Sequence, residues 1–144
     1  MSEAGAVFAN GPSPDEALWQ VWKAMDPPEG YRGEIIEGAI ELSPTARRSH
    51  GLIANRVRRV LDQFLDGGEY ACYQAGNVIH NRKAWIPDAF VAPEDTEPYR
   101  DKDDMGVTAD SVHLIVEVVS PGKRNQDRDR VKKRREYARA GIPV

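Results

Sequence analysis

The sequence of 144 residues has little cysteine, no long apolar run and no strong excess of either charge. Cys72 is its single cysteine, so no disulfide forms within the chain, which suits a reducing cytoplasm. No apolar stretch approaches the roughly 20 residues of a membrane span, and no secretory signal opens the sequence. We therefore expect a cytoplasmic protein without a membrane-spanning segment.

The formal net charge is −3, so total charge gives no reason to expect a nucleic-acid partner. Its distribution is uneven. Residues 47–59 carry five arginines and no acid, residues 123–139 carry nine basic and three acidic residues, and residues 94–104 carry six acidic and two basic residues. Two basic segments and one acidic loop are compatible with a cleft for a polyanion, but solvated helix faces are the simpler interpretation.

The length indicates one domain. Residues 1–13 are small and polar, and we expect a flexible N-terminus there, followed by a single domain over residues 14–144. Helical and strand patterns alternate along that domain, which predicts an α/β (α+β) fold. Ser13 is the expected N-cap of the first helix, and Glu37-Gly38 is the expected turn of a hairpin.

Two helices have apolar stripes that we expect to face the core. The first helix follows Pro14, and the second ends at about Asp66. The first stripe consists of Leu18, Val21, Trp22 and Met25; the second consists of Ile53, Val57, Val60, Leu61 and Phe64.

Residues 113–120, HLIVEVVS, are typical of a strand buried on both faces, with one carboxylate, Glu117, in its middle. A buried charge costs several kcal/mol unless a counter-charge, a proton or a metal ion compensates it. A second apolar run, WIPDAFVA, carries Asp88 directly after Pro87, where a proline favours a strand start or a bulge. Asp88 and Glu117 on neighbouring strands would supply hard oxygen ligands for Mg²⁺ or Mn²⁺.

A basic residue and a third acid complete the candidate site. Lys133, Tyr137 and Ala140 share one face of the last helix, which predicts that Lys133, and not Lys132, faces the sheet. There Lys133 would assist the attacking water, with Asp129 one turn earlier as a possible partner. Glu34, in the predicted hairpin, is a weaker candidate for metal binding.

His50 lies one turn before Ile53 on the second helix, so its ring could face the sheet. A lone histidine at such a position is more often a structural hydrogen-bonding group than a ligand, and we favour that interpretation over a catalytic one.

Three stretches resemble the Uma-two endonuclease family of the PD-(D/E)xK nuclease superfamily. They are EIIEGAIELSPTARRSHGLIANRVRRVL, IPDAFVAPED and LIVEVVSPGKRNQDRDRVKKRREYARAGIPV. The resemblance implies a restriction-endonuclease-like central mixed sheet flanked by helices, with a divalent metal at its acids. It matches Glu34 to the early acid, Pro87-Asp88 to the PD motif and Glu117 to the second acid.

The position where the superfamily usually has its lysine holds Val119, so the resemblance implies that the lysine has moved to Lys133. The family continues beyond the GIPV segment with another strand, whereas this sequence stops there and looks truncated at its C-terminus. We also consider a homodimer, because two sites cut a duplex most easily and an open sheet edge invites pairing.

Three interpretations follow. The first is a Mg²⁺- or Mn²⁺-dependent endonuclease acting on DNA. The second is a non-catalytic nucleic-acid-binding or assembly module with the same fold. The third is a structural protein in which Glu117 and Lys133 form a buried ion pair; we rank it last because it leaves Asp88 without a role.

Overall fold

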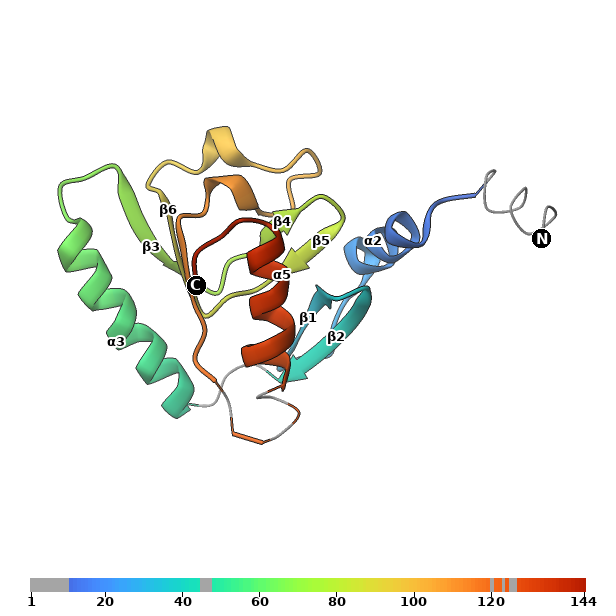
Figure 1. The fold of residues 1–144 in the computed structure, drawn as a ribbon, viewed down its shortest axis with the longest axis horizontal. Helices are drawn as coiled ribbons and strands as arrows, with labels where there is room; N and C mark the ends of the chain where they lie inside the picture. The colour runs from blue at the N-terminus through green and yellow to red at the C-terminus, as the bar shows by residue number, and fades with distance from the viewer. Residues whose placement is uncertain (1–10, 45–47, 120, 123, 125–126) are drawn as a thin grey trace.

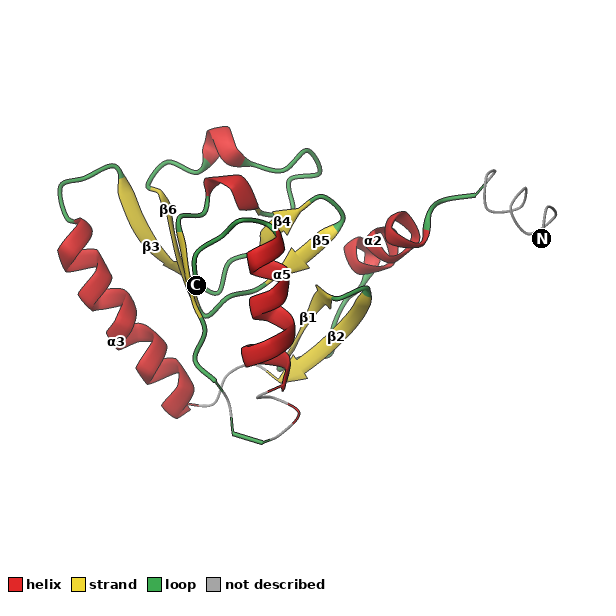
Figure 2. Cartoon of the chain, in the orientation of Figure 1, coloured by secondary structure: helices red, strands yellow, loops and turns green. Residues whose placement is uncertain are grey.

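The computed structural model describes residues 11–44, 48–119, 121–122, 124 and 127–144. Helices and strands alternate along the chain (Figures 1 and 2), which confirms the mixed α/β class. In order they are α2 (Pro14–Ala24), β1 (Tyr31–Ile36), β2 (Ala39–Pro44), α3 (Arg48–Leu65), β3 (Tyr70–Gln74), β4 (Val78–His80), β5 (Lys83–Trp85), β6 (Ala89–Pro93), η1 (Glu97–Tyr99), β7 (Val107–Thr108), η2 (Ala109–Ser111), β8 (Leu114–Val116), η3 (Asp127–Lys133) and α5 (Arg134–Arg139).

The strands form three small hydrogen-bonded sheets rather than one continuous sheet. β1 and β2 form an antiparallel hairpin, and β3, β6 and β8 form an antiparallel sheet in the order β3-β6-β8. The third sheet, β5-β4-β7, is the mixed one, because β4 runs antiparallel to β5 and parallel to β7. Figure 1 shows α3 beside β3, with α5 between the β3-β6-β8 sheet and the hairpin.

Alternation along β6 places α3 and α5 on opposite faces of the β3-β6-β8 sheet. Phe90 belongs to a buried cluster that includes Ile115 of β8 and Tyr137 of α5. Its neighbour Val91 belongs to another cluster, against which Leu61 of α3 packs. The sheet is therefore covered on both sides, and the ends of β6 and β8 lie between the two helices.

The predicted hairpin turn is confirmed. Glu37 and Gly38 have φ of 48° and 76°, and positive φ at both central residues is the mark of a two-residue type I′ turn. Ser13, the last residue of the predicted flexible segment, caps α2 by accepting a hydrogen bond from the Glu16 N–H at 3.1 Å. The expectation for residues 1–10 lies outside the described residues.

The expected inner face of α2 was wrong at one position. Val21 is 57% exposed, whereas Trp19 is fully buried beside Trp22. Both indole N–H groups find an acceptor: Trp19 donates to Asp103 Oδ2 at 3.0 Å and Trp22 donates to the Gly33 carbonyl at 2.9 Å. Burying two large aromatic groups with satisfied polar atoms stabilises this orientation more than burying one valine would.

The expected inner face of α3 was also wrong. Ile53, Val60 and Phe64 are 48%, 66% and 87% exposed, and Ala54 is the buried residue of the helix. Leu61 does pack against the sheet, as predicted. The small Ala54 side chain lets the helix approach the sheet closely, so the face with the larger apolar residues is turned to solvent.

The strand expected over residues 113–120 is shorter than predicted. β8 covers only Leu114–Val116, and of these residues Ile115 alone is fully buried. Its pairing with β6 ends at the pair Ala89 and Val116, because the segment before β6 contains Pro87, which has no N–H to continue a ladder. Glu117 therefore follows the strand instead of lying in its middle.

Among the described helices, none combines the length and the apolar character needed to cross a membrane.

Replacing Gly106 with alanine should lower the free energy of unfolding by about 1 to 3 kcal/mol. A Cβ at Gly106 would lie 2.7 Å from the Cβ of Asn77 and would also overlap the Asn77 backbone carbonyl. Gly51→Ala is the matched control, because its new methyl group meets nothing within 4 Å and alanine favours the helix by up to about 1 kcal/mol. Urea unfolding followed by tryptophan fluorescence measures both changes. Equal stability of the two variants would contradict the close contact between Gly106 and Asn77.

Candidate active site

Asp88 and Glu117 lie at the same end of two neighbouring strands. Asp88 directly precedes β6, Glu117 directly follows β8, and the antiparallel register pairs Ala89 with Val116. Beyond that pair the Asp88 side chain replaces a backbone acceptor of the ladder, since its Oδ2 accepts a hydrogen bond from the Val118 N–H at 2.6 Å. The two acids expected on neighbouring strands are thus brought together by the end of the ladder.

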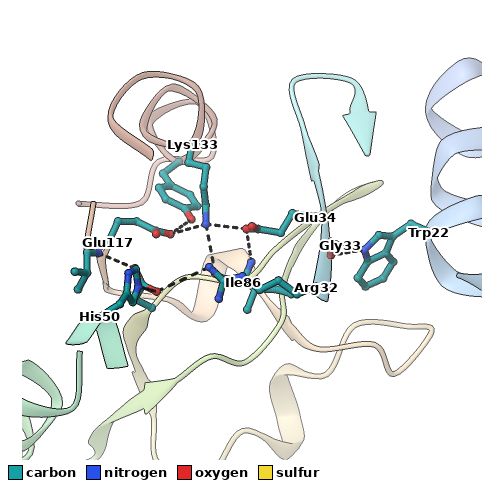
Figure 3. Close-up of polar contacts among 11 residues, drawn as sticks. Trp22, Arg32, Gly33, Glu34, His50, Ile86, Glu117 and Lys133 are labelled. Atoms are coloured by element: carbon teal, nitrogen blue, oxygen red, sulfur yellow. Dashed lines mark hydrogen bonds and ion pairs between the residues drawn. The ribbon is translucent and has the colours of Figure 1, made fainter. Parts of the chain in front are cut away.

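Lys133 is the centre of the polar cluster. Its side chain is fully buried, and Nζ lies 2.7 Å from Glu34 Oε2 and 2.8 Å from Glu117 Oε1. A third contact, 3.3 Å long, goes to the Ile86 carbonyl (Figure 3). The three protons of the ammonium therefore have three acceptors.

The neighbouring Lys132 has a different environment. Its side chain is 38% exposed and lies 3.6 Å from Glu41 Oε1. The helical spacing that predicted an inward Lys133 and an outward Lys132 thus describes the orientation correctly. The side chain of Asp129, expected to hold Lys133, lies outside the part of the chain that the structure describes.

Glu34 reaches the same ammonium from β1, on the other side of Lys133 from Glu117 (Figure 3). It is 1% exposed, and its Oε2 also accepts a hydrogen bond from the Ile86 N–H at 2.8 Å. The hairpin, the segment before β6 and the last helix are joined through these contacts. The metal-binding role expected for Glu34 stays a prediction, since its contacts are with an ammonium and an amide.

His50 contacts the site directly. Its Nε2 lies 2.7 Å from Asp88 Oδ1, and the ring comes from the first turn of α3. Its position one turn before Ala54, the buried residue of α3, explains why it faces the sheet. The preference for a hydrogen-bonding role agrees with this contact, and its partner is a candidate metal ligand.

Arg32 was missed in the sequence. Its Nη2 lies 3.9 Å from Asp88 Oδ1, and its side chain is 17% exposed. The signal was present, because Arg32 stands two residues before Glu34 and alternate residues of a strand share one face.

The electrostatics of the cluster favour a charged lysine and a weakly acidic Glu117. Burial raises the pKa of Glu117 to about 7; Lys133 opposes this rise, while Asp88 and Glu34 add to it. Burial alone would lower the pKa of Lys133, but Glu34 and Glu117 outweigh it and the pKa is raised. Tyr137 donates its hydroxyl proton to Glu117 Oε1 at 2.6 Å, and burial followed by Glu117 raises its pKa well above the usual value.

Asp88 and Glu117 are hard oxygen donors of the kind that Mg²⁺ and Mn²⁺ prefer. Glu117 Oε2 is buried and accepts no hydrogen bond from the described residues, which leaves one carboxylate oxygen for a cation. Within the described part of the chain, no three His, Cys, Asp or Glu side chains are arranged to hold a metal ion. Two carboxylates with water completing the shell are a common arrangement for Mg²⁺.

The structural interpretation requires a buried Glu117–Lys133 pair and gives Asp88 no role. The structure shows that pair, and it also gives Asp88 partners in His50 and the Val118 N–H. Measurement of metal binding therefore has to separate it from the endonuclease interpretation.

Comparison with known proteins identifies the family. The Uma2 family model, described as "Putative restriction endonuclease", matches residues 19–144. The chain belongs to this family.

A solved structure has a similar fold. It is the crystal structure of "a putative nuclease belonging to DUF820" from Anabaena variabilis, with 16% sequence identity and a TM-score of 0.54. The match covers 82% of this chain and 65% of that chain, so this chain spans less than two thirds of the length of its structural relative. None of the curated proteins matches the chain. The structural match supports the nuclease-like fold inferred for this Uma2 member.

Replacing Lys133 with methionine should destabilise the protein by about 3 to 5 kcal/mol, because Glu34 and Glu117 would be left buried without a counter-charge. The matched control is Lys132→Met, which removes a partly exposed ion pair and should cost less than about 1 kcal/mol. Urea unfolding at neutral pH measures both. Similar losses for the two lysines would show that the buried contacts do not support the fold.

Glu117→Gln should stabilise the metal-free protein at pH 8 but not at pH 5. Because the folded pKa of about 7 lies above the ordinary 4.5, the contribution of Glu117 to stability is complete below pH 4.5 and is lost as pH rises through 7. A shift of this size corresponds to about 3 kcal/mol, an upper bound for the gain in the glutamine variant.

Unfolding in urea with EDTA, repeated across this pH range, measures the gain. Glu69→Gln is the control, since Glu69 is exposed and loses little solvation on folding. A gain for Glu117→Gln that does not grow with pH would contradict the predicted direction.

Proposed function

We propose that this Uma2 protein is a Mg²⁺- or Mn²⁺-dependent endonuclease that hydrolyses phosphodiester bonds of DNA. The observation that carries the proposal is a buried cluster: Asp88 and Glu117 lie at the ends of two neighbouring strands, and Lys133 from the last helix contacts Glu117. Membership of the Uma2 family, whose description is "Putative restriction endonuclease", supports it.

Asp88 and Glu117 would hold the metal ion. A divalent cation held there would supply positive charge for the phosphate and would make a bound water more acidic. Glu117 contributes its orphan Oε2, while Tyr137 and Lys133 hold its other oxygen. These contacts fix the carboxylate before any ligand arrives.

Lys133 acts through its charge. Its raised pKa keeps the ammonium protonated at neutral pH, so it does not serve as a general base there. From its buried position next to Glu117, this fixed positive charge would stabilise the negative charge that develops on the phosphoryl oxygens. Glu34 positions this ammonium, and the Ile86 carbonyl fixes the third direction.

His50 positions Asp88. With Nε2 on Oδ1 and the Val118 N–H on Oδ2, both oxygens of the carboxylate are oriented by hydrogen bonds. Second contacts of this kind orient metal-binding groups in many metalloproteins. The first turn of α3 is therefore part of the proposed catalytic architecture.

The surface around the site supports a nucleic-acid substrate. Exposed arginines include Arg48 and Arg56 on α3 and Arg134 at the start of α5. Figure 1 shows the first turn of α3 and the start of α5 at the same side of the molecule. His50 of that turn contacts Asp88, and Lys133, directly before α5, contacts Glu117. Exposed arginines on these two helices would provide phosphate contacts for DNA, and a homodimer would present one site to each strand.

A non-catalytic binding module is the second candidate. It is favoured by the saturation of the site: Lys133 has three acceptors, and both oxygens of Asp88 are hydrogen-bonded. Such a module would bind nucleic acid with the same surface but would not cleave it.

Wild-type protein should bind Mn²⁺ saturably and nick supercoiled plasmid DNA in its presence, and Asp88→Asn and Glu117→Gln should each remove both properties. Each amide keeps the shape of the side chain and removes the charge that binds the cation. Isothermal calorimetry at pH 7.5 measures binding, and agarose electrophoresis measures nicking. Asp110→Asn is the control, since Asp110 is an exposed acid in η2.

The outcomes separate the candidates. Binding of Mn²⁺ and DNA without nicking supports the non-catalytic module. Absence of Mn²⁺ binding in the folded wild-type protein supports the structural role of the Glu117–Lys133 pair and contradicts the endonuclease proposal.

A further inference from the structure

A cavity of about 260 Å³ opens beside Asp88. Its polar wall contains Arg32, His50 and Asp88. The rest of the lining includes the polar Gln74 and the apolar Ala54 and Ile86. The cavity therefore joins a small apolar surface to the side of the site where His50 and Arg32 meet Asp88.

Arg32 lines this cavity, and its guanidinium carries a hydrogen-bond donor without an acceptor among the described residues. That donor is the buried Nε. Leaving such a donor without an acceptor costs on the order of 1 to 3 kcal/mol. Asp88 does not satisfy it, because the Asp88 carboxylate is held by His50 and the Val118 N–H and lies 3.9 Å from Arg32 Nη2.

The missing acceptor has a defined chemistry. The planar guanidinium offers parallel N–H groups, which match two oxygens of a phosphate or carboxylate. A ligand here must bring anionic oxygens to Arg32 and an apolar body to Ala54 and Ile86. A phosphodiester with its attached sugar has both parts.

We propose that Arg32 binds a phosphate of the nucleic-acid substrate in this cavity, with the attached sugar against Ala54 and Ile86. The inference rests on the proposed function, and it adds a substrate-binding residue to the metal-binding and positioning groups. Since the cavity borders Asp88, the phosphate on Arg32 lies at or next to the bond that is cut. Arg32 thereby determines which phosphate is presented to the carboxylates.

A purely structural role for Arg32 makes a different prediction. An arginine that only balances the charge of Asp88 would support folding, and its loss would not change the number of phosphates the protein neutralises. A phosphate contact releases counterions from DNA, so its loss changes the salt dependence of binding. One contact contributes about 0.9 to the slope of log K against log salt.

The experiment measures binding of a fluorescein-labelled duplex oligonucleotide by anisotropy, in CaCl₂ and at NaCl concentrations from about 50 to about 200 mM. Arg32→Ala should weaken binding roughly tenfold to hundredfold at the lowest salt, as expected for a charge-assisted contact. It should also reduce the magnitude of the slope of log K against log salt by about 0.9. Arg32→Lys should keep the slope and lose affinity, because an ammonium keeps the positive charge but lacks the parallel N–H groups of the guanidinium.

Arg82→Ala is the matched control, since it removes one positive charge from the β4–β5 turn, where Arg82 pairs with Glu16. It should keep the wild-type slope. Thermal unfolding establishes that each variant is folded; if Arg32→Ala does not fold, an unchanged affinity of Arg32→Lys overturns the inference.

If the wild-type protein binds and nicks DNA, and Arg32→Ala has the same affinity and the same salt slope, the role of Arg32 is overturned while the proposed function stands. A folded wild-type protein that neither binds the duplex nor nicks plasmid DNA with Mn²⁺ overturns the proposed function and this inference together.

Discussion

The buried ammonium of Lys133 between Glu34 and Glu117 is the interaction on which the site depends. A lone charge in the interior is strongly unfavourable, and it is tolerated here because every proton of the ammonium has an acceptor. Those acceptors come from β1, from the end of β8 and from the segment before β6. One side chain therefore fixes the relative positions of three elements that are distant in the sequence.

The cluster is nevertheless short of positive charge. Glu34, Asp88 and Glu117 face Lys133 and the more distant Arg32. Burial raises the pKa of Glu117 to about 7, and the nearby Asp88 and Glu34 add to this rise. A proton relieves the imbalance at low pH, and a divalent cation would relieve it at neutral pH. In the proposed function, this imbalance lowers the stability of the metal-free site, and a bound cation would offset that loss.

Sequence patterns predicted the features that depend on local spacing. The hairpin turn, the Ser13 cap and the inward orientation of Lys133 follow from φ preferences, capping chemistry and helical periodicity, and the structure has all three. The inner face of α3 could not be predicted in this way, because apolar content favoured Ile53 and Phe64 while close packing required Ala54. The pairing of His50 with Asp88 follows from that packing and has no separate signature in the sequence.

The orientation of α3 connects this failed prediction to the proposed mechanism. Had the larger apolar residues faced the sheet, the helix would stand farther away and His50 would not reach Asp88. With Ala54 at the contact, the first turn of α3 approaches closely enough for a 2.7 Å hydrogen bond and for the wall of the cavity beside Arg32. The exposure of Ile53, Val60 and Phe64 is thus a consequence of the same packing that holds the candidate metal ligand in place.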